Sequence, residues 1–448
     1  MDFLLAIIIF AISLFFSILK NISTIIPLLI GLVCFVATAL NRGFKLKNIF
    51  KMIITGMLKS IIVIRIFVLI GLITAVWRAC GTIPFFVYYG TKLINPEYFI
   101  LFAFLLSCIV SFTLGTSFGT VGTIGVVLIV LARGGNVDVN ITAGAIFSGA
   151  FFGDRCAPTS SSANLVATIT WTNLYDNVKN MFITAAIPFI AAALIYLLFS
   201  KENPLILSNN SLLDDIAQNF QLNFVVMLPA LIIISLAIFK VDVKLSMLLS
   251  IVSGIIISIF VQNLSLINII KYMIAGFKLN SNGTFSDIIS GGGLISMVNV
   301  SFIVLIASSY SGIFEGTGML NQIQNLLEKI SLKIKIYPTM ILTSVITAIF
   351  GCNQTLAIIL SHQLMDKIYK KNGRSNSELA IDLENTVVLI SELIPWNIAI
   401  AVPMATLSVG VNSIPFAVFL YLVPLYNLFH SKIKKLNHIV WVIFKPRN

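Results

Sequence analysis

Apolar runs of about 20 residues recur along the whole chain, and this pattern constrains the fold more than any other feature of the sequence. A run of this length matches an α-helix that crosses a bilayer, whereas barrel strands give alternating segments of about 10 residues. Hydrophobic residues make up 58% of the 448 residues and charged residues only 10%, far below the roughly 25% of soluble domains. The sequence therefore predicts an all-α polytopic membrane protein that lies in a lipid bilayer.

The net charge of +12 would suggest a nucleic-acid partner in a soluble chain. Here the basic residues gather in short loops between apolar runs, where they act as topology signals. The five cysteines lie in apolar segments or helix breaks without CxxC spacing, and the three histidines are scattered. We therefore expect no nucleic acid, no cofactor and no metal beyond a transported ion. The first apolar run, 3–18, lacks the features of a signal peptide and is interpreted as a retained span.

One apolar region is interrupted by the polar stretch FGDRCAPTSSSANL, Phe152–Leu165. The pattern indicates a membrane helix that starts, breaks between Gly153 and Pro158, and resumes. Hydrocarbon offers no water to freed backbone groups, so such a break needs burial in protein or a cavity to line. Charge within a span is costly and usually serves an ion or substrate pathway, which makes Asp154 the first candidate site residue. A short loop at the membrane surface with an incidental Asp154–Arg155 pair is the alternative.

Three landmarks of the first half return in the second at a nearly constant offset in residue number. Gly81-Thr82 returns as Gly316-Thr317, Gly115 as Gly351, and Pro158 as Pro395. This spacing predicts a duplicated unit. The first repeat is 1–200 and the second 224–430, with a polar linker 201–223 between them and a basic tail 431–448 after them.

Charge bias reverses between corresponding loops. Loop 41–51 carries four basic residues and no acid, whereas its counterpart 277–287 carries one of each. Loop 132–140 has one basic and one acidic residue, whereas 363–378 has four basic and two acidic. Because positive loops stay inside, the two halves are predicted to lie in opposite orientation, as an inverted-topology repeat. Both termini are then expected in the cytoplasm. The membrane itself, the bacterial cell (inner) membrane, is implied by a family resemblance described below.

The threading has about ten spans and two re-entrant hairpins. Spans are expected near 3–19, 23–40, 57–90, 141–172, 181–199, 224–239, 245–262, 290–326, 383–410 and 416–430. The hairpins are 98–131 and 336–364, whose arms of about 16 apolar residues are short for a span, so that dipping in and crossing twice both remain open. The broken spans 141–172 and 383–410 are expected to place their breaks at the midplane.

Only four of the 17 acidic residues are expected at depth: Asp154, Glu315, Glu384 and Glu392, of which Glu384 is nearest the interface. Asp154 and Glu392 each lie just before a helix-breaking proline. We expect these two carboxyls to face each other near the midplane, where inverted-repeat transporters bind their cargo. Buried carboxylates can bind Na⁺, accept H⁺ or do both in turn, because burial disfavours their charged form.

A structural role for Glu392 stays open, as the partner of a basic residue such as Lys59, Arg65 or Arg78. Arg155 is expected to pair with Asp154 or to hold an anionic substrate. The neutral residues expected to complete an ion or substrate site are Thr116, Ser117, Ser160, Ser161, Ser162, Asn164, Asn353, Gln354 and Asn397, with helix breaks at Gly153, Pro158 and Pro395. Their oxygens suit a hard cation, although Ser and Thr also join membrane helices.

Four motifs match a known family in order and spacing: WRACGTIPFFVYYG (77–90), GTSFGTVGT (115–123), SGAFFGDRCAPTSSSANL (148–165) and IPWN (394–397). Over most of its length the chain resembles the NhaC-type sodium/proton antiporter family. The resemblance implies an inner-membrane secondary transporter of the wider ion-transporter superfamily, some of whose NhaC-like members exchange organic acids with cations. The matching positions are Asp154, Pro158, Asn164, Pro395, Trp396 and Asn397.

Three positions depart from the family pattern. The family usually has Asp where this chain has Ser161 and Asn385, and Pro where it has Glu392. The loss of two family carboxylates puts a simple Na⁺/H⁺ stoichiometry in doubt, while Glu392 restores one charge at a shifted position.

The sequence thus favours a secondary transporter that exchanges Na⁺ for H⁺ by alternating access. The alternative is a Na⁺- or H⁺-coupled transporter of a small carboxylate or amino acid, with Arg155 at the anion. A channel is less favoured because the halves offer one paired site and no ring of charges. An enzyme is least favoured because no histidine lies near the breaks. A homodimer is compatible with the sequence.

Overall fold

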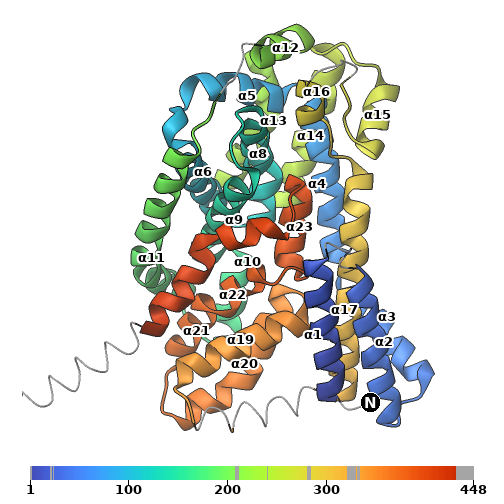
Figure 1. Cartoon of the computed structure of the whole chain (residues 1–448), viewed down its shortest axis with the longest axis vertical. Coiled ribbons are helices and arrows are strands. Elements are labelled where there is room, and N and C mark those ends of the chain that lie inside the picture. The colour runs from blue at the N-terminus through green and yellow to red at the C-terminus, as the bar shows by residue number, and fades with distance from the viewer. Residues whose placement is uncertain are drawn as a thin grey trace, which may run out of the picture.

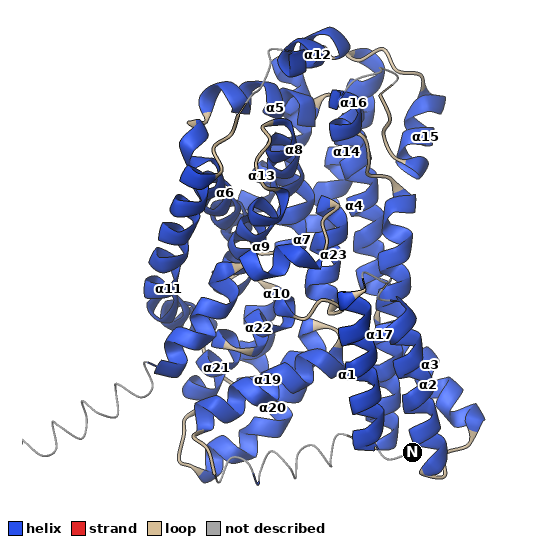
Figure 2. Ribbon diagram, viewed as in Figure 1, coloured by secondary structure: helices blue, strands red, loops and turns tan. Residues whose placement is uncertain are grey.

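The computed structural model describes residues 3–20, 23, 25–206, 211–239, 241–279, 284–319, 329 and 333–429. Within these ranges nearly every regular element is a helix, apart from one isolated bridge between Phe277 and Gly291 (Figure 2). The predicted basic tail 431–448 lies outside the described residues.

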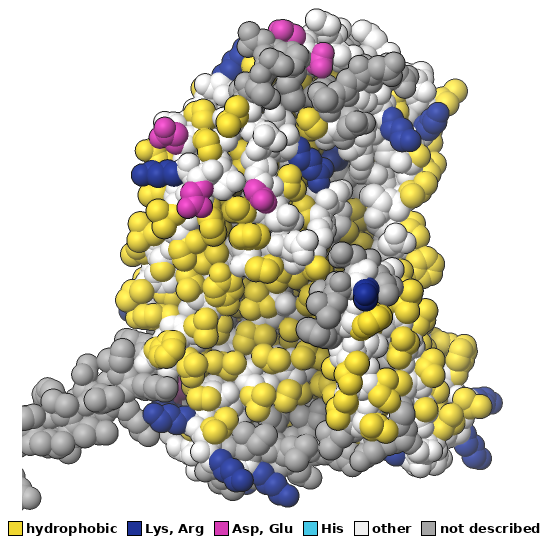
Figure 3. Space-filling view, viewed as in Figure 1, with side chains coloured by type: hydrophobic (Ala, Val, Ile, Leu, Met, Phe, Trp, Pro, Cys, Tyr) yellow, Lys and Arg dark blue, Asp and Glu magenta, His cyan; other side chains and the backbone are white. Residues whose placement is uncertain are grey.

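The described helices have the lengths and compositions of membrane spans. Five are long and apolar enough to cross a bilayer: Pro96–Leu114, Ser117–Gly134, Leu174–Glu202, Val243–Phe260 and Leu294–Thr317. Three further helix pairs pass the same test as bent spans. On the face in Figure 3, hydrophobic side chains form a broad band across the middle, while most Lys and Arg side chains lie above and below this band and Asp and Glu lie mainly above it. The helices and this band indicate a multi-pass membrane protein.

The first half opens with two paired helices, α1 (Phe3–Leu19) and α2 (Ile25–Asn41). They are followed by α3 (Leu46–Lys59), α4 (Ile61–Ala79) and α5 (Thr82–Leu93). The expectation of one span over 57–90 is wrong, because the chain bends by 43° between α3 and α4 and turns at Gly81, whose φ of +85° suits glycine.

The hairpin and the break that follow lie where the sequence predicts them. The first hairpin consists of α6 (Phe99–Leu114), the short α7 (Ser117–Thr120), a π-helical turn (Val121–Gly125) and α8 (Val126–Gly134). The first broken helix consists of α9 (Val139–Cys156) and α10 (Ser161–Thr170). The long α11 (Leu174–Glu202) closes this half.

The predicted linker contains a helix of its own, α12 (Ser211–Asn219). The second half then has α13 (Leu228–Ile238), α14 (Val243–Phe260), α15 (Leu266–Ala275), α16 (Thr284–Ile289) and α17 (Val298–Thr317). The second hairpin is α19 (Ile336–Gly351) and α20 (Gln354–Lys371). The second broken helix is α21 (Asn376–Asn385), α22 (Val387–Ile390), a 3₁₀ turn (Ser391–Leu393) and α23 (Ile398–Leu407). An apolar helix, Val418–Phe429, follows.

Unusual backbone conformations recur in the two halves at one constant spacing in residue number, which we call the repeat offset. Residues with positive φ pair at this offset as Gly81 with Gly318, Gly115 with Cys352, Asn136 with Gly373, and Trp171 with Ser408. The N-caps of α10 and α23, Ser160 and Asn397, obey the same spacing. This geometry revises two of the sequence pairings, since Gly81 corresponds to Gly318 rather than Gly316, and Gly115 to Cys352 rather than Gly351. It supports the predicted duplication.

Each hairpin packs against both broken helices, which draws the two breaks together. The first hairpin contacts α9 through α6 and α23 through the π-helical turn, and the second contacts α10 and α21 through α20. Figure 1 shows α6 and α8 in the upper half of the molecule and α19 and α20 in the lower half. The close approach of α6 to α9 depends on small residues, since a Cβ at Gly149 would lie 2.5 Å from the Phe104 carbonyl oxygen. The small-residue contact between α6 and α9 therefore lies at Gly149 and Gly153.

Candidate functional site

Asp154 lies in the last turn of α9, and its side chain is enclosed by hydroxyl groups from two elements. The Ser160 hydroxyl, at the start of α10, donates to Asp154 Oδ1 at 3.2 Å. The Ser117 hydroxyl, at the tip of the first hairpin, donates to Asp154 Oδ2 at 3.3 Å. Ser162 donates to the backbone carbonyl of Asp154 at 3.1 Å and bonds to the Ser160 hydroxyl at 2.8 Å. Because Asp154 is only 6% exposed, this carboxyl sits in a polar cage inside the protein.

Gln354 connects this cage to the second half. It occupies the tip of the second hairpin, one repeat offset after Ser117, and its side chain lies within interaction range of the Asp154 carboxyl. Its amide donates to Glu392 Oε1 at 2.7 Å and to the Val388 carbonyl at 3.1 Å. Glu392 is fully buried and close enough to Asp154 for the two carboxyls to interact electrostatically. Asp154 and Glu392 therefore belong to one buried cluster, whereas their facing each other near the midplane stays a prediction.

The repeat does not relate these two acids to each other, however. At the repeat offset, Asp154 corresponds to Ser391 and Glu392 to Arg155. In the described part of the chain, Glu392 Oε2 has no hydrogen-bond partner. Two of the basic partners suggested for Glu392 do not bond to it in the described structure. Arg65 is exposed, and Arg78 donates to the Thr74 carbonyl at 2.7 Å. The Lys59 side chain lies outside the described residues.

The described hydrogen bonds of Arg155 go to residues other than Asp154, so they do not support the alternative in which these two side chains pair. Its guanidinium is fully buried and donates to the Glu384 and Met181 carbonyls at 3.1 and 3.2 Å. It also donates to Thr184 Oγ1 at 3.0 Å and to the side chain of Asn385. These bonds tie the end of α9 to α11 and α21 and leave few donors for an anionic substrate. Arg155 is a positioning residue of the break.

Glu384, one of the four acids expected at depth, is fully buried inside the protein at the end of α21, and neither carboxyl oxygen has a hydrogen-bond partner in the described structure. Its position relative to the membrane interface stays a prediction. Its nearest compensating charge is Arg155, and it also interacts with Asp154. Glu315, also expected at depth, lies on an exposed face of α17, apart from this cluster.

Several other predicted site residues form hydrogen bonds to backbone groups at the breaks and helix starts. Asn397 donates to the Ala348 carbonyl at 3.0 Å and caps α23, while Asn353 caps α20. Asn164 donates to the Pro158 and Ser160 carbonyls and so braces the first break. Among the described hydrogen bonds, these asparagines shape the breaks and make none to Asp154. The prolines Pro158 and Pro395 lie in the breaks as predicted.

Thr116 and Ser161 line a cavity of about 490 Å³ beside the cage. They flank the two hydroxyl donors of Asp154, because Thr116 precedes Ser117 and Ser161 follows Ser160. Thr159 lines the same cavity, and Asp242 and Lys244 bring charges from the N-cap and first turn of α14. The partly polar cavity is therefore lined by residues that adjoin the cage residues Ser117 and Ser160 in the chain.

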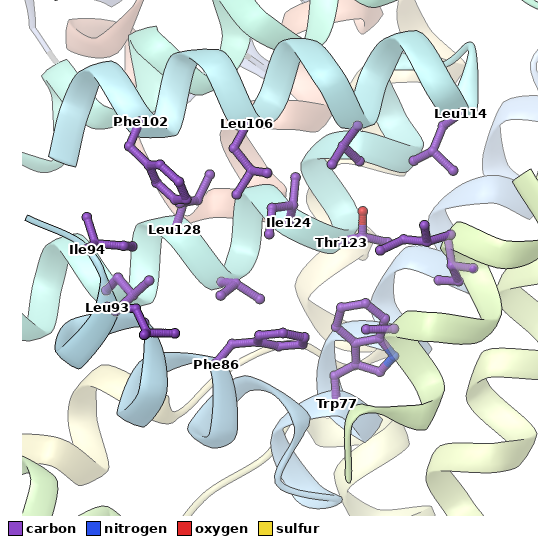
Figure 4. A pocket seen from close by; sticks show the side chains of 17 residues that line it. Trp77, Phe86, Leu93, Ile94, Phe102, Leu106, Leu114, Thr123, Ile124 and Leu128 are labelled. Carbon is purple, nitrogen blue, oxygen red and sulfur yellow. The ribbon is translucent and has the colours of Figure 1, made fainter. Parts of the chain in front are cut away.

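A second cavity of about 310 Å³ lies between α4, α5, α6, α8 and α13 (Figure 4). Its lining is apolar, with Phe86, Phe102 and Leu128 turned towards the space, and the Trp77 indole nitrogen is already bonded to Ser250 at 2.9 Å. Thr123 is the polar side chain besides Trp77 on this lining, so the cavity suits a cation less well than the Asp154 cage does.

The cage offers oxygen ligands of the kind that a hard alkali cation prefers. Hydroxyl groups can rotate, so Ser117 and Ser160 can turn their lone pairs towards a cation while Asp154 supplies the charge. When no cation is bound, a proton on a carboxyl removes the cost of burying its charge. The same group of atoms can therefore hold Na⁺ and H⁺ in turn.

Comparison with known proteins agrees with this geometry. A family model described as the Na⁺/H⁺ antiporter family matches residues 2–169 and 149–429. The chain belongs to this family. The NhaC Na⁺/H⁺ antiporter of Bacillus subtilis is 30% identical over 426 residues, 93% of this chain and 94% of the relative. The NhaC antiporter of Alkalihalophilus pseudofirmus is 30% identical over 377 residues, 83% and 82% of the two chains. The malate-2H⁺/Na⁺-lactate antiporter of Bacillus subtilis is 24% identical over 405 residues, 87% and 86%.

Membership of the Na⁺/H⁺ antiporter family accords with the resemblance seen in the four motifs. Two features of the site were not predicted from the sequence: the inclusion of Glu384 in the cluster around Arg155 and Asp154, and the bridge from Gln354 to Glu392. The position of Gln354 was a usable indication of the bridge, because it lies one repeat offset after Ser117. The sequence contains no comparable indication of the partners of Glu384, which lies at the end of the polar helix α21.

Proposed function

We propose that this protein is a secondary transporter that exchanges Na⁺ for H⁺ by alternating access, with the Asp154 cage as the shared site. The observation that carries the proposal is a buried carboxyl held by hydroxyls from the first hairpin and the first break, and linked through Gln354 to a second buried carboxyl, Glu392. Na⁺ entering the cage would displace a proton, because both compete for the same carboxylate charge. Re-protonation on the other side would release Na⁺.

The exchange requires two access states, and we propose that an inverted repeat supplies them. The reversed charge bias of the loops and the recurrence of backbone features at the repeat offset both support it. So does the layout of the chain in Figure 1, where the end of α20 lies with the N-terminus and the end of α8 lies at the opposite end. In this proposal both termini are cytoplasmic, and the units 1–200 and 224–430 are the two repeats.

Sided labelling tests this topology. A cysteine introduced at Asn136, in the exposed turn before α9, should react from outside the cell, and one at Asn372, in the exposed turn after α20, from inside. The five native cysteines are buried, so the parent chain gives the background. Reaction of both introduced cysteines from one side would contradict the inverted repeat.

One observation favours a second candidate, the coupled transport of a small carboxylate or amino acid. The 490 Å³ cavity beside the cage is far larger than a bare cation, and Lys244 on its wall could face an anion. A relative named for malate and lactate exchange, at 24% identity, points the same way. Arg155 is a poorer anion ligand than the sequence suggested, because its donors are already used within the break.

Proteoliposomes loaded with a pH-sensitive dye separate the two candidates. Under a preset pH gradient, external Na⁺ or Li⁺ should drive proton flux, whereas K⁺ and choline should give little. Malate, lactate and arginine, each as a salt of an inert counter-ion, should add nothing if the main proposal holds. Flux that requires an organic substrate in addition to Na⁺ would replace it with the second candidate.

A further inference from the structure

The two breaks have the same backbone but differ in what covers them. Ser161, the first residue of α10, is exposed on the wall of the 490 Å³ cavity. Its counterpart at the repeat offset is Ile398, the first residue of α23, which is only 2% exposed. The same comparison holds one position before the N-caps, where the exposed Thr159 corresponds to the buried Trp396.

Aromatic side chains close the second break. We name Phe10, Phe35, Tyr310, Phe314 and Trp396 the aromatic cluster. The ring of Phe10 lies 6.2 Å from that of Trp396, 5.7 Å from Phe35 and 5.6 Å from Tyr310, measured between centroids. The Trp396 indole also donates to the Ile349 carbonyl at 3.1 Å. The cluster therefore joins α1, α2 and α17 to the break and packs the space beside Trp396 with rings.

A backbone hydrogen bond marks the same difference. The Ile398 amide donates to the Cys352 carbonyl at 2.8 Å, which fastens the second break to the tip of the second hairpin. The corresponding groups of the first half, the Ser161 amide and the Gly115 carbonyl, form no such bond among the described contacts. Although Gly115 packs closely on Thr159, the first break is thus unfastened at Ser161, where the cavity reaches it.

The cavity is also suited to conduct a cation. Its polar wall consists of Thr116, Thr159 and Ser161, and the opposite charges of Asp242 and Lys244 on the same lining add no net barrier. Asp242 is held in place, because its carboxylate caps α14 by accepting from the Lys244 amide at 2.8 Å. A volume of about 490 Å³ admits a cation with much of its hydration shell. From there the last step to Asp154 passes the hydroxyls of Ser117 and Ser160.

We propose that this cavity is the entry route for a hydrated monovalent cation to the Asp154 cage, and that the aromatic cluster closes the equivalent route past Ile398. The proposal deepens the proposed function and rests on it, since it takes Asp154 as the cation site. In the alternate state, the repeat predicts the reverse: the bond at Ile398 opens and the Ser161 side closes on Gly115.

Matched cysteines at the two equivalent positions test the route. Purified Ser161→Cys protein should react with a positively charged methanethiosulfonate reagent far faster than Ile398→Cys protein. NaCl should slow the Ser161→Cys reaction relative to choline chloride, and this protection should vanish when Asp154→Asn is added. Asn372→Cys, in an exposed turn, controls for effects of salt on the reagent and should show no Na⁺ protection.

Function gives the second readout. Attachment of the bulky reagent to Ser161→Cys should stop Na⁺-driven proton flux in proteoliposomes, whereas its attachment to Asn372→Cys should not. Equal reactivity of Ser161→Cys and Ile398→Cys, or full flux after the Ser161→Cys protein is modified, would overturn the route. Persisting flux in Asp154→Asn alone would instead overturn the proposed function, so the two failures are distinguishable.

Discussion

The first and second breaks show how a duplicated backbone can divide its chemistry. Both pass from a helix through a proline turn into an N-capped helix, with Ser160 and Asn397 as the caps. The cap of the first break also donates to a buried acid, whereas the cap of the second donates to a backbone carbonyl. In the mechanism we propose, the first break therefore binds the cation, and the second supports the hairpin tip and closes the equivalent route.

The difference has an energetic reason. A buried carboxylate is costly, so two complete copies of the Asp154 cage would double that cost without adding a second route. The second half instead contributes a neutral residue, Ser391, where the first has Asp154, and sends Gln354 and Glu392 across to the same cage. The two breaks thus share backbone features at the repeat offset, while the buried carboxyls gather around one of them.

The largest expected effect comes from the acid itself. Asp154→Asn keeps the size and hydrogen bonding of the side chain but removes its charge, so Na⁺-driven proton flux should fall to the level of empty liposomes. Ser391→Ala, at the equivalent position, should keep flux near that of the parent, because the Ser391 hydroxyl only bonds back to the Val387 carbonyl at 2.7 Å.

A double variant guards against an indirect explanation. If Asp154 served only to balance Arg155, then Asp154→Asn with Arg155→Gln should restore both folding and flux. The structure predicts that flux stays at background in the double variant, since the Arg155 donors go to other groups. Near-parental flux in it would remove Asp154 from the mechanism and shift attention to Glu392.

The next effect concerns stability rather than transport. Arg155→Gln would leave the Glu384 and Met181 carbonyls without their donor and the buried Glu384 carboxyl without its nearest positive charge. Breaking a buried charge arrangement in this way costs on the order of 3 kcal/mol. Arg155→Gln should therefore lower the midpoint of thermal unfolding in detergent. Arg65→Gln, an exposed arginine on α4, is the control and should leave it unchanged.

The helices and breaks could be predicted from the sequence because they depend on local chemistry. Apolar runs of sufficient length form helices, and Pro158 and Pro395 interrupt them wherever the chain goes afterwards. The prediction of one span over 57–90 was wrong because the left-handed turn at Gly81 interrupts the helix, and the apolar composition of this run does not indicate such a turn. The orientation of the two halves in the membrane is a prediction from the charge bias of the loops.

The features that could not be predicted from the sequence are those that depend on which helices pack against each other. Asp154 was found because an acid in an apolar run is conspicuous, whereas the partners of Arg155 on α11 and α21 follow only from three-dimensional packing. The partners of Glu384 were not predicted for the same reason, because a polar helix at a membrane surface and one buried against other helices have similar compositions. The repeat offset became definite only through backbone dihedral angles.

The smallest expected effects compare neighbouring serines of the first break. Ser160→Ala removes a hydrogen bond to Asp154 and the N-cap of α10. A hydrogen bond to a charged group is worth about 1.5 kcal/mol, so the apparent affinity for Na⁺ should weaken about tenfold. Ser161→Ala removes a hydroxyl that lines the cavity and makes no hydrogen bond to Asp154 among those described, so the apparent affinity should change by less than about twofold, within the small effects typical of exposed positions.

The same position also tests how the cavity communicates with the cage. The family usually has Asp where this chain has Ser161, and Ser161→Asp would place a negative charge on the entry route. We expect it to strengthen the apparent affinity for Na⁺, because a carboxylate attracts cations into the cavity, and to do so less at high ionic strength, where exposed charges are screened. Flux titrations against Na⁺ at low and high choline chloride measure both effects. A loss of affinity in Ser161→Ala as large as in Ser160→Ala would instead make Ser161 a direct ligand, and the two serines would no longer divide into cage and route.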